Sequence, residues 1–178
     1  MKKSKEIISD KVAVVNQILP HTNKWAWDLF IDGAANNWMP TEISMAKDIE
    51  QWKSNLLSED EKLVVKRCLG FFAGSESLVA NNLLLSIFKY VTDPECRQYI
   101  LRQAYEESLH NLTVVYVCDS LNLKIGEVYQ AYNSIPSIKA KDDFLMNITS
   151  DINRPDFNIN TIEGKREFLR NIITYYVI

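Results

Sequence analysis

Two long stretches with the period of an α-helix follow one another in this sequence, and they constrain its fold more than any other feature. The first covers about 58–90 and starts at Ser58 and Glu61, which match a capping box. The second covers about 93–121 and starts with an aspartate at the N-cap and Pro94 at the first helical position. Because almost no chain separates them, we expect the two helices to pack antiparallel.

The rest of the sequence also predicts helices. A loop is expected over 36–42, since Pro40 disfavours a helical conformation at Met39. The sequence has only five Gly and five Pro, too few for the turns of an all-β protein of this length. No repeat or linker-like segment marks a boundary, so we expect a single all-α domain over residues 1–178. Shorter helices are predicted over 5–18, 24–34, 45–54, 124–133, 137–150 and 161–178.

Charge and composition argue against several classes of partner. The net charge is −3, with 47% hydrophobic and 24% charged residues, so nothing attracts nucleic acid or anionic lipid. No stretch reaches the roughly 20 apolar residues of a membrane span. The basic start is not a signal peptide, because Ser9, Asp10 and Lys11 interrupt its apolar run. We therefore expect a cytoplasmic protein that binds neither nucleic acid nor membrane.

The cysteines fit the same compartment. Cys68, Cys96 and Cys118 are odd in number, lie far apart in helix-patterned stretches, and include no C-x-x-C pair. Reduced thiols are the plain interpretation, and a zinc site built on sulfur is disfavoured.

Ionisable residues interrupt the inner face of both long helices. Glu76 stands in the apolar stripe of the first helix, and Glu107 and His110 stand one turn apart in the stripe of the second. A buried carboxylate without a partner is costly, so each must be paired, protonated or bound to a cation. The stripes otherwise consist of Val65, Leu69, Phe72, Val79 and Leu83 in the first helix and Ile100, Gln103, Val114 and Val117 in the second.

These three residues match half of a known kind of metal site. Glu-x-x-His places a carboxylate and an imidazole roughly 5–6 Å apart at Cβ. Ferritin-like dimetal proteins use one Glu from each of two helices and a Glu-x-x-His from each of two others. Carboxylates with one imidazole and no thiolate suit iron or manganese better than structural zinc. The alternative is a Glu paired with Lys or Arg at a helix end or interface. His21, near a helix start, is interpreted as a surface or capping residue.

Four segments resemble the small subunit of class I ribonucleotide reductase. They occur in the family's order, the spacing of Glu76 and Glu107 is the family's, and the similarity runs from about Lys24 to the C-terminus. The resemblance implies a ferritin-like helical bundle of the dimetal-carboxylate type. The segments are 36–42 (NNWMPTE), 71–79 (FFAGSESLV), 97–110 (RQYILRQAYEESLH) and 138–144 (IKAKDDF).

The resemblance also implies roles for individual residues. Glu76 corresponds to the first metal ligand, Glu107 to the bridging carboxylate and His110 to the imidazole on the same metal. Trp38 matches the tryptophan that relays an electron towards the metal site, although the residue alone would indicate only packing. The implied function is that of the ribonucleoside-diphosphate reductase small subunit. Such a homodimer supplies the oxidising equivalent for deoxyribonucleotide synthesis, and thus DNA replication, to the large catalytic subunit.

The first departure from the family concerns the radical. The family's radical tyrosine lies four residues after the ligand histidine, where this sequence has Val114, which cannot form a tyrosyl radical. The sequence is similar to the subgroup without this tyrosine, so a manganese–iron centre is preferred over two irons. Tyr116 lies two residues beyond Val114, about 200° around the helix, and cannot simply substitute. It resembles a tyrosine that helps electron delivery in the subgroup, and core packing is the alternative.

The second departure concerns length. The family's other Glu, its second Glu-x-x-His and its docking tail have no counterpart before Ile178. We therefore expect the N-terminal half of such a protein, inactive unless completed by more chain or by a second polypeptide. Two alternatives stay open: a ligand-binding Mn/Fe oxidase of the same superfamily, and a non-catalytic helical fragment. Trp38 and its Asn-Asn-Trp-Met-Pro context favour the reductase, because an oxidase needs no long-range electron path.

Overall fold

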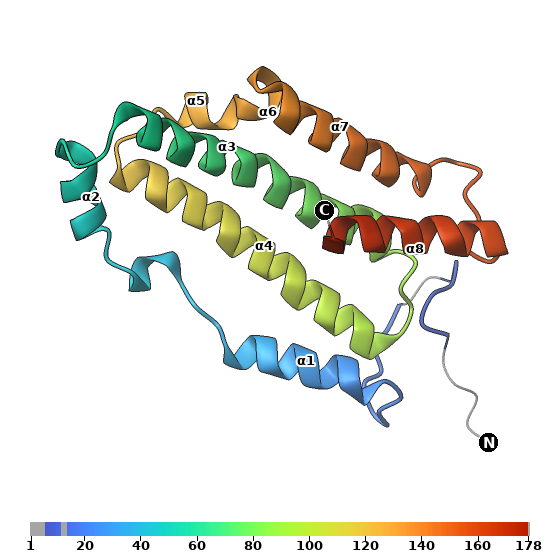
Figure 1. The fold of residues 1–178 in the computed structure, drawn as a ribbon. Helices are drawn as coiled ribbons and strands as arrows, with labels where there is room; N and C mark the ends of the chain where they lie inside the picture. The colour runs from blue at the N-terminus through green and yellow to red at the C-terminus, as the bar shows by residue number, and fades with distance from the viewer. Residues whose placement is uncertain (1–5, 12–13, 178) are drawn as a thin grey trace. The chain divides into compact units, whose positions relative to one another are not determined.

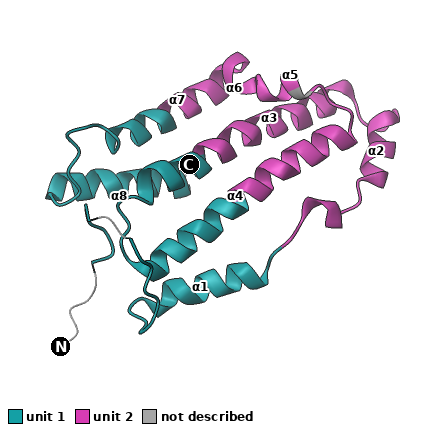
Figure 2. Ribbon diagram, turned by 180° about the vertical axis from the view of Figure 1, so that it is seen from behind, with its two compact units in different colours: residues 1–37, 79–106, 145–178 teal, residues 38–78, 107–144 magenta. Residues whose placement is uncertain are grey.

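The computed structural model describes residues 6–11 and 14–177, and these residues form two compact units. Unit 1 comprises 1–37, 79–106 and 145–178, and unit 2 comprises 38–78 and 107–144 (Figure 2). Each unit has its own buried core. Nine residues that include Leu83, Ile100 and Phe168 form the core of unit 1. Ala73, Val114, Cys118 and Val128 form the core of unit 2. One domain over residues 1–178 remains a prediction.

The described chain is helical, so the predicted all-α class is confirmed (Figure 1). Its only β pairing within the described ranges is an isolated bridge between Ile8 and Val91. The helices are α1 Lys24–Ala35, η1 Pro40–Glu42, α2 Ala46–Lys53, α3 Glu59–Asn81, η2 Asn82–Ile87, α4 Pro94–Ser120, α5 Ile125–Tyr129, α6 Ala131–Ser134, α7 Pro136–Asp151 and α8 Ile162–Val177.

Both predicted starts of the long helices are confirmed at the level of their caps. The Ser58 backbone N–H donates to Glu61 Oε2 at 2.8 Å, and the Glu61 N–H donates to Ser58 Oγ at 3.3 Å. At the second start, the Cys96 N–H donates to Asp93 Oδ1 at 2.9 Å. These bonds satisfy N–H groups that a helix leaves without partners in its first turn.

The first long helix differs from the prediction at its end. The α-helical part ends at Asn81, and a π-helical turn, η2, continues to Ile87. The wider turn buries four of its side chains, including Asn82 and Ser86. Within unit 1, Asn82 and Asn171 exchange side-chain amide hydrogen bonds of 2.8 and 3.1 Å. A buried amide pair of this kind explains how two polar residues remain stable in the core.

The helix predicted over 5–18 is wrong in the described parts of that range. The Ser9 N–H donates to the Tyr90 carbonyl at 2.8 Å, and the Thr92 N–H donates to the Ile7 carbonyl at 2.9 Å. The backbone of residues 7–9 is therefore hydrogen-bonded to the α3–α4 connection and does not form a helix. Val14 and Val15 remain 85% and 78% exposed, so this part of the segment has no buried apolar face that would stabilise a helix. Residues 12–13 lie outside the described ranges.

The start of α1 is organised by a buried carboxylate rather than by a histidine. Glu95, only 2% exposed, accepts the backbone N–H groups of Thr22 and Asn23 at 3.1 and 2.8 Å. His21 is exposed, as predicted, and its Nδ1 lies 2.8 Å from Glu95 Oε1. Among the other predictions, the helix over 124–133 is divided into α5 and α6, and the remaining helices are confirmed within a few residues. The loop predicted over 36–42 contains the short 3-10 helix η1.

Among the residues that the structure describes, one helical stretch, Glu59–Ile87, is long and apolar enough to cross a membrane by length and composition alone. Core helices of soluble proteins meet the same criterion, so this finding is weak evidence for a span.

In unit 2 the contact of α3 with α5 and α6 depends on Gly70. A Cβ at this position would lie 2.4 Å from the Ala131 Cβ and 2.8 Å from the Val128 carbonyl oxygen. Both distances are far inside van der Waals contact, and one partner is backbone that has little freedom to shift. The absence of a side chain at Gly70 therefore lets α3 approach this wall of unit 2 closely.

We predict that Gly70→Ala lowers the free energy of unfolding by about 1–3 kcal/mol, because overpacking outweighs the better helix propensity of alanine. Gly126→Ala is the matched control, since a Cβ there meets nothing within 4 Å. That control should leave stability unchanged or raise it by less than about 1 kcal/mol. Urea unfolding followed by circular dichroism measures both variants, and equal stabilities would contradict the predicted close contact.

Candidate metal centre

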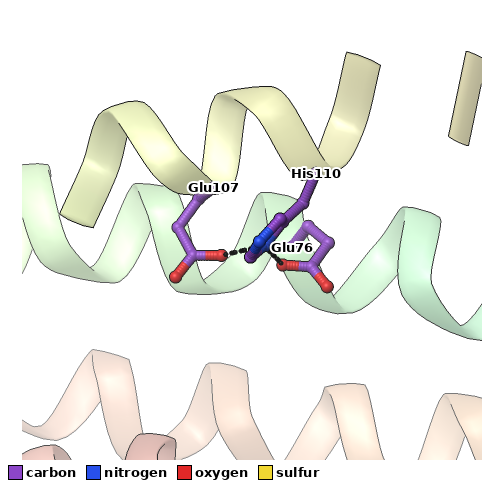
Figure 3. Close-up of side chains that lie close together, drawn as sticks. All are labelled: Glu76, Glu107 and His110. Atoms are coloured by element: carbon purple, nitrogen blue, oxygen red, sulfur yellow. Dashed lines mark hydrogen bonds and ion pairs between the residues drawn. The ribbon is translucent and has the colours of Figure 1, made fainter. Parts of the chain in front are cut away.

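Three ionisable side chains of unit 2 converge between α3 and α4 (Figure 3). Glu76 comes from α3, and Glu107 and His110 come from successive turns of α4. One potential ligand atom from each lies within 4.8 Å of the other two. The predicted convergence of these residues is therefore confirmed, whereas their binding of a metal remains a prediction.

A single imidazole nitrogen joins the two carboxylates. His110 Nδ1 lies 3.0 Å from Glu76 Oε2 and 3.1 Å from Glu107 Oε2. The three-residue step between Glu107 and His110 makes the second contact possible, since such residues lie on one helix face. Figure 3 shows both carboxylates turned towards the ring. Two carboxylates and one nitrogen thus surround a common point.

The three groups of this cluster shift one another's pKa values. Burial, followed by the hydrogen bond and negative charge of Glu76, raises the pKa of Glu107 to about 7. Partial burial lowers the pKa of His110, but the hydrogen bonds and charges of Glu76 and Glu107 together raise it above its usual value. A divalent cation would neutralise the carboxylates of Glu76 and Glu107 directly, in place of the protons that they share with His110. The donor set and its burial therefore fit a metal ion.

Trp38 lies beside this cluster. Its ring centroid is 6.1 Å from that of His110, and the two rings are inclined by 32°. Trp38, Glu76 and His110 also line one cavity of about 230 Å³, together with Leu69, Phe72, Thr113 and Val114. The structure thus brings all four residues predicted for the site, Trp38, Glu76, Glu107 and His110, into one part of unit 2.

The two residues that bear on radical chemistry have different surroundings. Val114 is 5% exposed and packs in the core of unit 2, one turn beyond His110. Tyr116 donates its hydroxyl hydrogen bond to the Ile43 carbonyl at 2.8 Å. This bond ties α4 to the segment that follows Trp38 and η1. Tyr116 thus contacts that segment through a hydrogen bond, and both interpretations of this residue, electron delivery and core packing, remain predictions.

Sequence analysis missed the hydrogen bonds that flank the ligands. Asn111 donates to the Glu107 carbonyl at 3.0 Å, and Ser77 Oγ donates to Asn111 Oδ1 at 3.3 Å. This contact joins α3 to α4 next to Glu76 and His110. The only signal in the sequence is that Ser77 and Asn111 each directly follow a predicted ligand.

A second missed feature is a cation on α7. Lys141 Nζ lies 4.0 Å from the centre of the Phe71 ring. Burial lowers the pKa of Lys141, and the negative charges of Asp142 and Glu76 oppose that shift. The positive charge of Lys141 therefore acts on Glu76 from the side of α3 that packs against α7 in unit 2.

Comparison with known proteins identifies the family. The family model for the ribonucleotide reductase small chain matches residues 15–178. The chain is 54% identical over 164 residues to the ribonucleoside-diphosphate reductase subunit beta of Chlamydia pneumoniae, covering 92% of this chain and 47% of that protein. It is 29% identical over 128 residues to the small chain of Neurospora crassa, covering 70% of this chain and 31% of that protein.

The fold agrees with solved structures of the same kind. The ribonucleotide reductase R2 subunit from Clostridium botulinum matches with a TM-score of 0.76 at 22% identity. That match covers 97% of this chain and 56% of the other, and it supports the ferritin-like helical fold. The chain spans about half the length of the curated relatives it matches, or less. On the family model and the Chlamydia relative, the chain belongs to the ribonucleotide reductase small-chain family.

Proposed function

We propose that this chain acts in the small subunit of ribonucleoside-diphosphate reductase, which supplies and relays an oxidising equivalent for deoxyribonucleotide synthesis. The observation that carries the proposal is the convergence of Glu76, Glu107 and His110 within 4.8 Å in a member of this family. The ring of Trp38 lies beside His110, which supports a path for electrons between Trp38 and the proposed metal site. We propose that its partners are the large catalytic subunit and a second copy of the small subunit. The proposed location is the cytoplasm.

Glu76, Glu107 and His110 are the proposed metal ligands. When bound, a pair of redox-active metals supplies the one-electron oxidation on which the reductase depends. Oxygen donors with one imidazole favour iron and manganese. Val114 supports a Mn/Fe pair over two irons, because its side chain cannot be oxidised to a radical. Three donors suffice to hold one ion, and a dinuclear centre needs further carboxylates and a second imidazole.

The other residues of the cluster hold and shield the ligands. The Ser77–Asn111 hydrogen bond fixes α3 against α4 beside Glu76 and His110. Buried Val114 and the cavity-lining Leu69 keep the site apolar on one side. Low polarity around the carboxylates strengthens their attraction for a cation. Trp38 is the proposed relay residue, and Tyr116 holds the segment that follows it through Ile43.

The first prediction concerns metal affinity. Glu107→Gln removes a charge but preserves shape, so we expect the chain's affinity for Mn²⁺ to fall at least about tenfold. His110→Gln should act similarly. Glu106→Gln is the matched control on the same helix, because Glu106 pairs with Arg102 at 2.5 Å instead of facing the cluster. The measurement is free Mn²⁺ by electron paramagnetic resonance, and equal affinities of all four proteins would refute the ligand assignment.

The second prediction concerns the oxidised state of the small subunit assembled with metal and oxygen. Because residue 114 is valine, we expect a metal-centred paramagnetic signal and no stable tyrosyl radical. Electron paramagnetic resonance of wild type and Tyr116→Phe, with iron alone and with manganese plus iron, makes the comparison. A narrow organic radical that survives in Tyr116→Phe and needs no manganese would contradict the Mn/Fe assignment.

The third prediction separates the reductase from an oxidase or an inactive scaffold. Trp38→Phe keeps a half-buried ring but loses the more easily oxidised indole, so stability should change by only about 1 kcal/mol. In the small subunit assembled with its large subunit, we expect normal metal content and loss of deoxynucleotide formation. Metal analysis and turnover are measured on the same sample. Near-wild-type turnover would make Trp38 a packing residue and favour the oxidase or the scaffold.

A further inference from the structure

Unit 2 contains a second concave site, at the end of α3 that is far in sequence from Glu76. Its cavity of about 580 Å³ is formed by α2, the first turns of α3, the α4–α5 connection, α5 and α6. Cavities of this size are typical of small-molecule sites. Four cations line it: Lys62, Lys66, Arg67 and Lys124. We call this cavity the basic groove.

Two of the four cations already have acidic partners in the groove. Lys62 Nζ lies 3.1 Å from Glu59 Oε1, and Lys124 Nζ lies 3.2 Å from Glu127 Oε1. No other acidic residue lines the groove. Lys66 and Arg67 form no ion pair with any residue in the described part of the chain. The groove therefore has an excess of two positive charges in a chain whose net charge is −3.

The remaining wall of the groove is apolar and fixed. Val128 and Ala131, 3% and 4% exposed, belong to the lining, together with half-buried Ile135 and Trp52. The rim at Asn122 has a left-handed backbone (φ 52°), and the Leu123 N–H closes the end of α4 by donating to the Cys118 carbonyl at 2.9 Å. The unpaired cations Lys66 and Arg67 thus lie in the same cavity as an apolar wall and the indole ring of Trp52. Such a cavity is complementary to an organic molecule that carries an anionic group.

We propose that the basic groove binds an organic phosphate. Its phosphate groups contact Lys66 and Arg67, and its ring or apolar body lies against Trp52 and the wall at Ile135. Guanidinium and ammonium groups form charge-assisted hydrogen bonds to phosphate oxygens. The concave, partly apolar lining favours a small molecule over an acidic protein segment, which would need only the cations.

Calorimetric titration of the 178-residue chain with ADP, pyrophosphate and adenosine, in buffer without divalent metal, tests this site. We expect ADP to bind more tightly than pyrophosphate, adenosine to bind weakly, and the ADP affinity to fall as salt is raised. The double variant Lys66→Gln/Arg67→Gln should weaken ADP binding about tenfold or more. Trp52→Ala should reduce the affinity for ADP towards that for pyrophosphate.

The matched control is Lys165→Gln/Arg166→Gln, which removes an adjacent Lys–Arg pair from exposed positions of α8. It should leave ADP affinity within about twofold of wild type. Circular dichroism checks that every variant folds. No binding of ADP or pyrophosphate at millimolar concentration, or equal weakening by both double variants, would overturn the proposal. Binding of a poly-glutamate peptide in place of ADP would also overturn it and identify a protein-docking surface.

Discussion

The carboxylates of Glu76 and Glu107, held around one imidazole between α3 and α4, are the constraint on which the organisation of unit 2 depends. Glu107 is 8% exposed, and its pKa is raised because burial and Glu76 both oppose its negative charge. An apolar residue at the same position would pack with no such cost. The fold therefore keeps a locally costly arrangement of ionisable groups, as proteins often do at functional sites.

Small and polar residues around the cluster make this arrangement tolerable. Ala73 and Val114 pack in the core of unit 2, and the Ser77–Asn111 hydrogen bond holds α3 and α4 together beside the ionisable cluster. Two turns earlier in α3, Gly70 permits close contact with Ala131. The helix that provides Glu76 is thus held by contacts with both α4 and α6 within unit 2. A ligand on a rigid helix keeps its geometry without help from a metal, which reduces the cost of binding one.

The sequence predicted those features that depend on neighbours along the chain. The Ser58 capping box, the Asp93 cap and the inward spacing of Glu107 and His110 are all local, and the structure has them. The failures depend on distant partners. Residues 6–9 form backbone hydrogen bonds with 90–93 and not a helix. The π-helical turn η2 contains Asn82, whose side chain forms a hydrogen bond with Asn171. Nothing within about ten residues of either segment signals its partner. The same holds for Tyr116 and Ile43, which lie 73 residues apart.

Acidic and basic residues occupy separate parts of α3, which the overall composition of the chain does not reveal. Glu59, Asp60 and Glu61 occupy the first turn, where the helix dipole favours acid, and Lys66 and Arg67 follow before the apolar stripe reaches Glu76. At a rise of 1.5 Å per residue, Arg67 and Glu76 are about 14 Å apart along the axis. The basic groove and the proposed metal ligand Glu76 therefore lie about two and a half helical turns apart on α3.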